Sequence, residues 1–171
     1  QKISGTPYKS DKVVLEEMER IAKSDFSKKT RAAAIKFLSK NGDASNKAIF
    51  EQAVNDSSYS VAGAGLSALA ALDPDHAYTL AKKLNVDSKG ALREAINSLL
   101  YSQGKEEDFD LLSKSYNDMG FSFEKLGSTS KFAEYLSKLN NFNNIKKGID
   151  DIITFYNAVP EAYKDRITPL F

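Results

Sequence analysis

An internal repeat is the feature of this sequence that most constrains its fold. The aspartates Asp25, Asp56, Asp87 and Asp118 are evenly spaced with a 31-residue period, and the apolar residues around them match at the same offset. The matching columns are Ala33, Ala64 and Ala95; Leu38, Leu69 and Leu100; and Met18, Ile49, Leu80 and Leu111. A period of about 20–50 residues is typical of stacked repeats, in which each unit buries its apolar face against the next.

Each 31-residue unit is predicted to hold two helices. Apolar residues recur at spacings of three and four over residues 30–40, 59–71 and 89–102, which is helical periodicity. The second helices are expected at 46–55, 74–84 and 106–117, and a preceding half-unit at 11–24. No alternating run of β-branched residues competes with this pattern. The sequence therefore predicts an all-α fold, an α-α solenoid of HEAT-like helix pairs.

The turns between these helices carry residues that start and stop helices. Asp73 is expected to cap a helix that has Pro74 at its first position. Gly42 is expected to adopt the left-handed conformation at the end of a helix. Gly104 is expected to end the helix predicted at 89–102. Each recurring aspartate precedes a helix, where its carboxylate can accept a hydrogen bond from an unpaired backbone N–H group.

The repeat divides the chain into three parts. Residues 1–10 form an N-terminal tail, 11–118 the HEAT-like repeats, and 119–171 an irregular helical cap that we expect to be truncated in an excised or processed chain. Helices are predicted at 121–126, 129–139 and 144–157, the last capped by Asn144. Residues 109–171 hold 11 of the 18 aromatic residues. These aromatic residues either cover the open end of the array or form a docking surface.

Composition excludes several classes of function. With 24 basic and 23 acidic residues, the formal net charge is +1, which argues against a nucleic-acid partner or a polybasic membrane surface. The basic groups Lys28-Lys29-Arg31 and Lys82-Lys83 are interpreted as solvated helix faces. The longest stretch without charge, 57–72, is too short and too rich in glycine and serine to span a membrane.

The sequence offers no catalytic or metal-binding constellation. It has no cysteine, one histidine (His76) and no H-E-x-x-H motif, so the usual zinc site cannot form. Gly63-Ala64-Gly65 lacks the preceding strand of a dinucleotide loop and is interpreted as a close contact between helices. We therefore expect no catalytic residue, cofactor or metal ligand, and no enzyme activity in this chain.

One set of positions predicts an interaction surface. Lys47, Tyr78 and Phe109 occupy equivalent places on the second helices, and Glu51 and Lys82 lie one turn further on. Second helices commonly line the concave face of such a stack. The two aromatic rings are either anchors for a partner or fillers of gaps between helices.

Two segments of the chain resemble a known family. The run from Asp56 to Val61, the run Leu66-Ser67-Ala68-Leu69-Ala70-Ala71-Leu72-Asp73-Pro74 and the stretch from Ala77 to Leu84 resemble the HEAT-like C-terminal domain of gluzincin metallo-aminopeptidases. These are of the aminopeptidase N type, in the form common among Bacteroidetes. The tail, Ile149 to Ile153 and Val159-Pro160 to Asp165, is similar to the end of such proteins, so the resemblance spans about residues 11–168.

The resemblance implies a non-catalytic domain of a zinc enzyme. In the family, the zinc and the catalytic motifs belong to an upstream domain, and the helical domain packs on it and restricts substrate access. The implied partners are that catalytic domain in the same polypeptide and the peptide substrate passing nearby, and the implied location is the periplasm or cell envelope. The alternative is a free-standing helical-repeat adaptor that binds a protein partner on its concave face.

Overall fold

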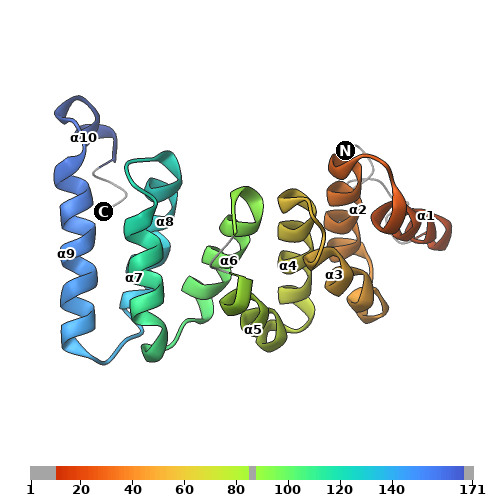
Figure 1. Cartoon of the computed structure of the whole chain (residues 1–171), viewed down its shortest axis with the longest axis horizontal. Coiled ribbons are helices and arrows are strands. Elements are labelled where there is room, and N and C mark those ends of the chain that lie inside the picture. The colour runs from red at the N-terminus through yellow and green to blue at the C-terminus, as the bar shows by residue number, and fades with distance from the viewer. Residues whose placement is uncertain (1–10, 85–87, 168–171) are drawn as a thin grey trace. The chain divides into compact units, whose positions relative to one another are not determined.

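The computed structural model describes residues 11–84 and 88–167, whose regular elements are all helical (Figure 1). The expected tail 1–10 and Asp87 lie outside the described residues. The chain forms two compact units, Gln1–Leu99 and Leu100–Phe171. The sequence predicted its change of pattern at residue 118, whereas the boundary between the compact units falls inside α6 (Gly90–Gln103).

The first helices of the predicted pairs keep the 31-residue spacing. These are α2 (Lys28–Asn41), α4 (Tyr59–Leu72) and α6, which begin at residues 28, 59 and 90. The second helices, α1 (Lys12–Ser24), α3 (Lys47–Val54) and α5 (Pro74–Leu84), alternate with them. The predicted bounds agree with these helices to within two residues.

Within the N-terminal unit the helices form two layers. Helices α2 and α4 run side by side, α1 contacts α3, and α4 also packs on α3 and α5 (Figure 1). The leucine column is buried as predicted, with Leu38 and Leu69 inside this unit and Leu100 in the next. The alanine column is only partly buried, since Ala64 lies in the core while Ala33 is exposed.

Two glycines let the backbones in this unit approach one another. A Cβ atom on Gly63 would overlap the carbonyl group of Ala91 at the start of α6, and one on Gly65 would lie 2.7 Å from the Cβ of Ala53 on α3. The interpretation of Gly63-Ala64-Gly65 as a helix contact is thus confirmed. Only a residue without a side chain fits such a backbone approach.

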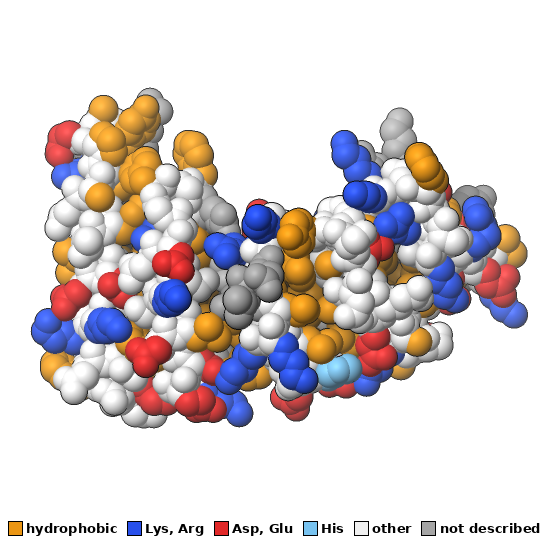
Figure 2. Space-filling model, in the orientation of Figure 1, with side chains coloured by type: hydrophobic (Ala, Val, Ile, Leu, Met, Phe, Trp, Pro, Cys, Tyr) orange, Lys and Arg blue, Asp and Glu red, His pale blue; other side chains and the backbone are white. Residues whose placement is uncertain are grey.

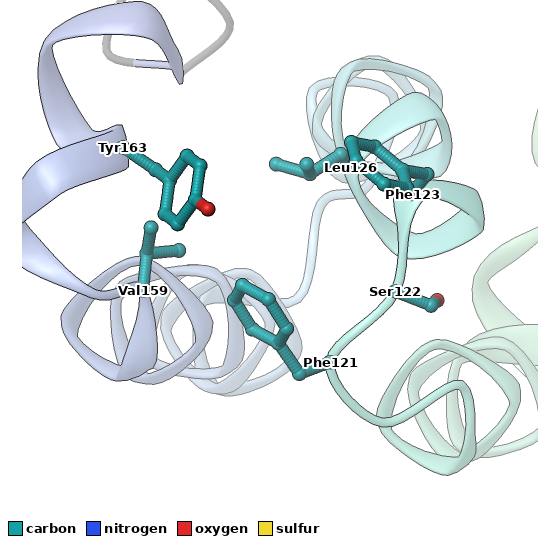
Figure 3. Close-up of a pocket in the computed structure, with 6 residues that line it drawn as sticks. All are labelled: Phe121, Ser122, Phe123, Leu126, Val159 and Tyr163. Atoms are coloured by element: carbon teal, nitrogen blue, oxygen red, sulfur yellow. The ribbon is translucent and has the colours of Figure 1, made fainter.

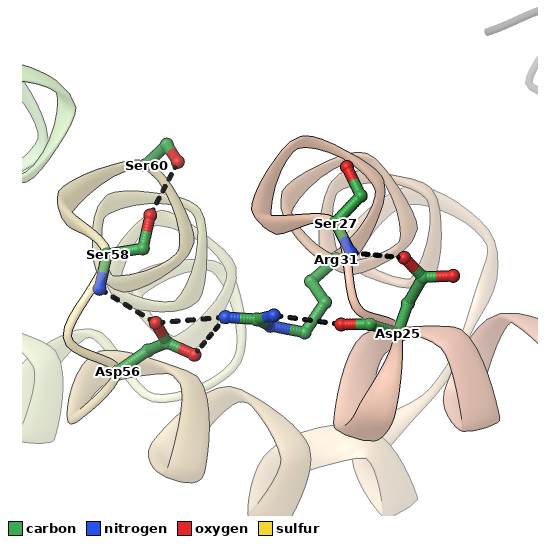
Figure 4. Close-up of polar contacts among 6 residues, drawn as sticks. All are labelled: Asp25, Ser27, Arg31, Asp56, Ser58 and Ser60. Atoms are coloured by element: carbon green, nitrogen blue, oxygen red, sulfur yellow. Dashed lines mark hydrogen bonds and ion pairs between the residues drawn. The ribbon is translucent and has the colours of Figure 1, made fainter.

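Two of the recurring aspartates, Asp25 and Asp56, lie at the turns between one helix pair and the next (Figure 4). Asp25 and Asp56 each accept a hydrogen bond from the backbone N–H two residues on, of Ser27 at 2.7 Å and of Ser58 at 2.8 Å. Ser27 and Ser58 are the N-cap residues of α2 and α4. Arg31 joins the two turns, because its guanidinium donates to the carbonyl of Asp25 at 2.8 Å and to the carboxylate of Asp56 at 2.9 and 3.2 Å.

One of the predicted helix ends has a different physical cause. Helix α2 ends at Gly42 as expected, but Gly42 has φ of −84° and is not left-handed. A Cβ atom there would collide with the amide oxygen of Asn46 and the carbonyl of Leu38, so the glycine serves a close approach. Gly104 closes α6 as predicted, with its N–H on the carbonyl of Leu100 at 2.6 Å.

The C-terminal unit departs from the predicted elements. Its helices are α7 (Phe109–Asp118), α8 (Phe123–Leu136), α9 (Phe142–Ala158) and α10 (Glu161–Ile167). The two short helices expected at 121–126 and 129–139 are a single helix, α8. Gly127 lies exposed in the middle of this helix and does not break it. Helix α9 is capped by Asn141, which accepts from the N–H groups of Asn143 and Asn144, so Asn144 is inside the helix.

A cluster of aromatic rings forms the core of this unit. Tyr116 stacks on Phe132 with ring centroids 4.6 Å apart and meets Phe155 edge-on at 6.3 Å. Tyr101 and Tyr135 also lie against the Phe132 ring, at 5.7 and 6.2 Å. Offset and edge-on contacts of this kind stabilise a core beyond the burial of area alone. These five rings are therefore core residues of the C-terminal unit, whereas other aromatic residues of the unit remain exposed.

Candidate functional site

Helices α3 and α5 bring four polar side chains together. The Lys47 ammonium lies 2.7 Å from the carboxylate of Asp73 and 3.9 Å from that of Glu51. The Nδ1 atom of His76 lies 3.4 Å from Glu51 Oε1. Figure 2 shows the single histidine side chain, pale blue, beside acidic and basic side chains on the surface. We call Lys47, Glu51, Asp73 and His76 the polar cluster.

Asp73 has two roles in this cluster. Its Oδ1 accepts the backbone N–H of His76 at 3.1 Å, which caps α5 as the sequence predicted, and its Oδ2 binds Lys47. The hydrogen bond from Lys47, followed by that from the His76 backbone, lowers the pKa of Asp73 below its usual value. The same hydrogen bond raises the pKa of Lys47. Lys47 and Asp73 are therefore fixed charges at neutral pH.

Tyr78 and Lys82 continue this surface along α5. The Lys82 ammonium lies 5.5 Å from the centroid of the Tyr78 ring, one turn away on the same helix face. Tyr78 is half-buried and Lys82 is exposed. A tyrosine ring of this kind presents an apolar body and a polar tip, which suits a contact with another protein.

Phe109 does not belong to an exposed face. It lies in the C-terminal unit with only 2% of its surface exposed, and the ammonium of Lys147 stands 5.4 Å from its ring centroid. The structure thus corrects the expectation of an exposed Phe109 contact, and the other interpretation, a ring that fills a gap between helices, applies to it. Lys47, Glu51, Tyr78 and Lys82 remain as the predicted contact residues on α3 and α5.

The C-terminal unit holds an apolar pocket that the sequence did not reveal (Figure 3). A cavity of about 290 Å³ opens between the start of α8 and the region where α9 passes into α10. The ring of Phe121 and the side chains of Val159 and Tyr163 face Leu126 across the cavity, while the hydroxyl of Ser122 points away. Phe123 at its edge is 92% exposed, and Figure 2 shows hydrophobic side chains gathered over this end of the unit.

A buried lysine lies near the aromatic core. Lys125 has 6% of its surface exposed, and its ammonium stands 4.4 Å from the ring centroid of Tyr116 and 5.0 Å from that of Phe155. Burial lowers the pKa of Lys125, and the carboxylate of Asp151 opposes that shift. Ser113 donates a hydrogen bond to Asp151 at 2.8 Å. The two rings give the ammonium a cation–π environment in place of water.

The described residues hold neither a metal cluster nor a membrane-spanning helix. Between residues 11 and 84 and between 88 and 167, no three His, Cys, Asp or Glu side chains gather as a metal site. Over the same ranges, no helix combines the length and the apolar character that crossing a membrane needs.

Half of the polar cluster follows from the sequence, and none of the pocket does. Repeat register places Lys47 and Glu51 on the face, whereas the sequence predicts only a capping role for Asp73. The sequence did carry a signal for this contact. In a stack of helix pairs consecutive second helices are neighbours, so a residue such as Asp73 that caps one second helix lies near the preceding second helix. The pocket lies where the repeat has ended, so no column of equivalent residues marks it.

Comparison with known proteins adds no assignment. No protein-family model matches the chain, and neither the curated proteins nor the solved structures that were compared give a match.

Proposed function

We propose that this chain is a non-catalytic α-α solenoid module of the HEAT-like type that binds another protein surface. The observation that carries the proposal is the constant spacing of α2, α4 and α6, which begin at residues 28, 59 and 90, together with the contacts between α2 and α4 and between α1 and α3. Stacks of equivalent helix pairs present extended surfaces for binding.

The binding surface in this proposal is the face of α3 and α5. It carries the polar cluster, whose side chains are held by contacts of 2.7–3.9 Å, with Tyr78 and Lys82 beside it. Preorganised side chains lose little entropy on binding, and complementary charges select the partner. Interfaces between domains of one chain are moderate in area and fairly polar, and this face has that polar character.

The resemblance described above supplies the specific form of the proposal. The partner is then the catalytic domain of a zinc aminopeptidase in the same polypeptide, and the face of α3 and α5 restricts the peptides that reach its active site. The zinc belongs to that domain, and no residue of this chain acts on the substrate. The alternative is a free-standing adaptor that offers the same face to a separate protein.

The reading frame upstream of Gln1 separates the two forms. A long in-frame segment with H-E-x-x-H supports the aminopeptidase form, whereas a start codon immediately before Gln1 supports the adaptor.

A kinetic experiment on the full-length parent then tests the face itself. The double variant Tyr78→Ala, Lys82→Ala should change KM or the preference for peptide length, while zinc content and turnover of the shortest substrates stay the same. Phe109→Ala is the control, because this buried ring should affect thermal stability and leave KM unchanged. Unaltered kinetics in the double variant, with normal folding, would refute the assignment of this face.

A further inference from the structure

The N-terminal unit carries a second surface, formed by other helices. A groove of about 650 Å³ is lined by residues of α1, α2 and the start of α4. Met18 and Ile21 of α1 and Phe37 of α2 contribute apolar groups to it, and Ala33 lies exposed between its ends. We call this the α2 groove.

The α2 groove is lined by three lysines and by no acidic residue among those described. Lys29, Lys36 and Lys40 are all exposed and stand at positions i, i+7 and i+11 of one helix, so they follow one face for about 16 Å. None of the three has an ion pair within the described part of the chain. Two neighbouring cations differ, since Arg31 binds Asp56 and Lys23 lies 3.9 Å from Glu19.

Ala33 provides an apolar group between these lysines. It follows Lys29 by four positions and precedes Lys36 by three, so it lies on the same face of α2. Its repeat column predicts a core position, yet it is exposed here. Figure 2 shows basic side chains spread over the region of α1 and α2. An apolar strip bordered by cations suits a ligand with an apolar edge and flanking anions.

We propose that the α2 groove binds an acidic amphipathic segment of another protein. Its apolar side chains contact Met18, Ile21 and Ala33, and its carboxylates pair with Lys29, Lys36 and Lys40. Laying an amphipathic segment into an apolar groove is a recurrent mode of recognition, and charge complementarity selects the partner. The proposal is independent of the function assigned to α3 and α5.

Two other occupants fit the groove less well. The N-terminal segment 1–10 carries Lys2 and Lys9 and no acidic residue, so three more lysines would repel it. A nucleic acid would gain from stacking aromatic rings, and none is exposed among the described residues of the groove. The net charge of +1 also provides little long-range attraction for a polyanion.

The test uses a fluorescein-labelled synthetic peptide of about 14 residues, long enough to follow α2 for the span of the lysines. The peptide has leucines at spacings of three and four and glutamates on both flanks, and its anisotropy is titrated with residues 1–171. Replacing the three lysines (K29E, K36E, K40E) should weaken binding at least about tenfold at about 0.15 M salt. The control K83E, K89E, K114E has the same net charge and should change binding less than about twofold.

A single substitution distinguishes the peptide from a polyanion. Ala33→Lys adds a cation but removes the apolar contact at this position. It should therefore weaken binding of the peptide and strengthen binding of a single-stranded oligonucleotide of thymidine. Circular dichroism checks the fold of every variant, and a Lys→Gln triple variant gives a milder form of the same change. Three results would overturn the proposal. Both charge-reversal variants could lose peptide binding equally, or Ala33→Lys could strengthen peptide binding. The third is tighter binding of the oligonucleotide than of the peptide.

Discussion

Arg31 on α2 holds the carboxylate of Asp56 with two hydrogen bonds, at 2.9 and 3.2 Å, although the two residues are far apart in the sequence. Their side chains are 16% and 21% exposed, so the pair is shielded from water more than an ordinary surface ion pair. Asp56 also accepts the N–H of Ser58, the N-cap residue of α4. The pair thus ties the position of α4 to that of α2.

A double-mutant cycle with Arg31→Ala and Asp56→Asn measures this tie. We expect a coupling energy of about 1–3 kcal/mol, the range for hydrogen bonds between charged partners that are partly buried. Urea denaturation of the four proteins provides the free energies of unfolding. Arg31→Lys should recover only part of the loss, because one ammonium cannot contact both the Asp25 carbonyl and the Asp56 carboxylate as the two guanidinium nitrogens do. A coupling near zero would show that each residue acts alone.

Leu69 should be among the most costly positions to truncate. It is fully buried on α4, and Leu69→Ala should lower the free energy of unfolding by about 2–5 kcal/mol. Leu72→Ala on the same helix is the matched control, because Leu72 is 41% exposed and should lose much less. Similar losses for both leucines would contradict the assigned core.

Two glycines in helices should respond to alanine in opposite ways. Gly63→Ala should destabilise the protein by about 1–3 kcal/mol, because the new methyl group meets the backbone of Ala91 and that backbone has to move. Gly127→Ala in α8 should stabilise it by about 0.5–1 kcal/mol, since nothing lies near the added carbon and alanine favours helix. Thermal unfolding of the two variants is the measurement. A stabilising Gly63→Ala would mean that α4 and the start of α6 are not in close contact.

Lys125 makes the stability of the C-terminal unit depend on pH. Its pKa is lowered in the folded state, so folding disfavours the charged form, and this penalty is complete below the folded pKa and disappears above the ordinary value of 10.5. Desolvation of the ammonium is the largest cause of this shift, and the two cation–π contacts offset only part of its cost. Lys125→Met should therefore stabilise the protein at pH 7, and its advantage should shrink as the pH rises toward 10.5.

The measurement for Lys125 is the difference in free energy of unfolding between the variant and the parent at pH 7 and near pH 10. Taking the difference cancels the titration of groups that the two proteins share. A variant that is less stable at pH 7 would show that the rings of Tyr116 and Phe155 outweigh the cost of burial.

Periodicity predicted the N-terminal unit well, because each helix there has an equivalent one period away in the sequence. The bounds of α5 were predicted without error, since Asp73 and Pro74 are strong signals for a helix start. Periodicity also assigned Phe109 to a face, but it does not tell which neighbour covers that face, and α9 provides Lys147 over the ring. Helix α8 has no equivalent helix one period away. From sequence alone, a glycine at an exposed position inside a helix cannot be distinguished from a glycine that ends a helix.

The ion pair between Arg31 and Asp56 determines which end of the N-terminal unit should open first. The position equivalent to Arg31 in the next 31-residue repeat holds Ala62, so the same guanidinium bridge cannot recur at the next pair of helices. There the charged tie is Lys47 to Asp73, whose side chains are 42% and 33% exposed and which dissolved ions therefore screen more strongly. Rising ionic strength should loosen α5 while α2 and α4 stay closed, so amide hydrogen exchange would speed up first at the α5 end of the unit.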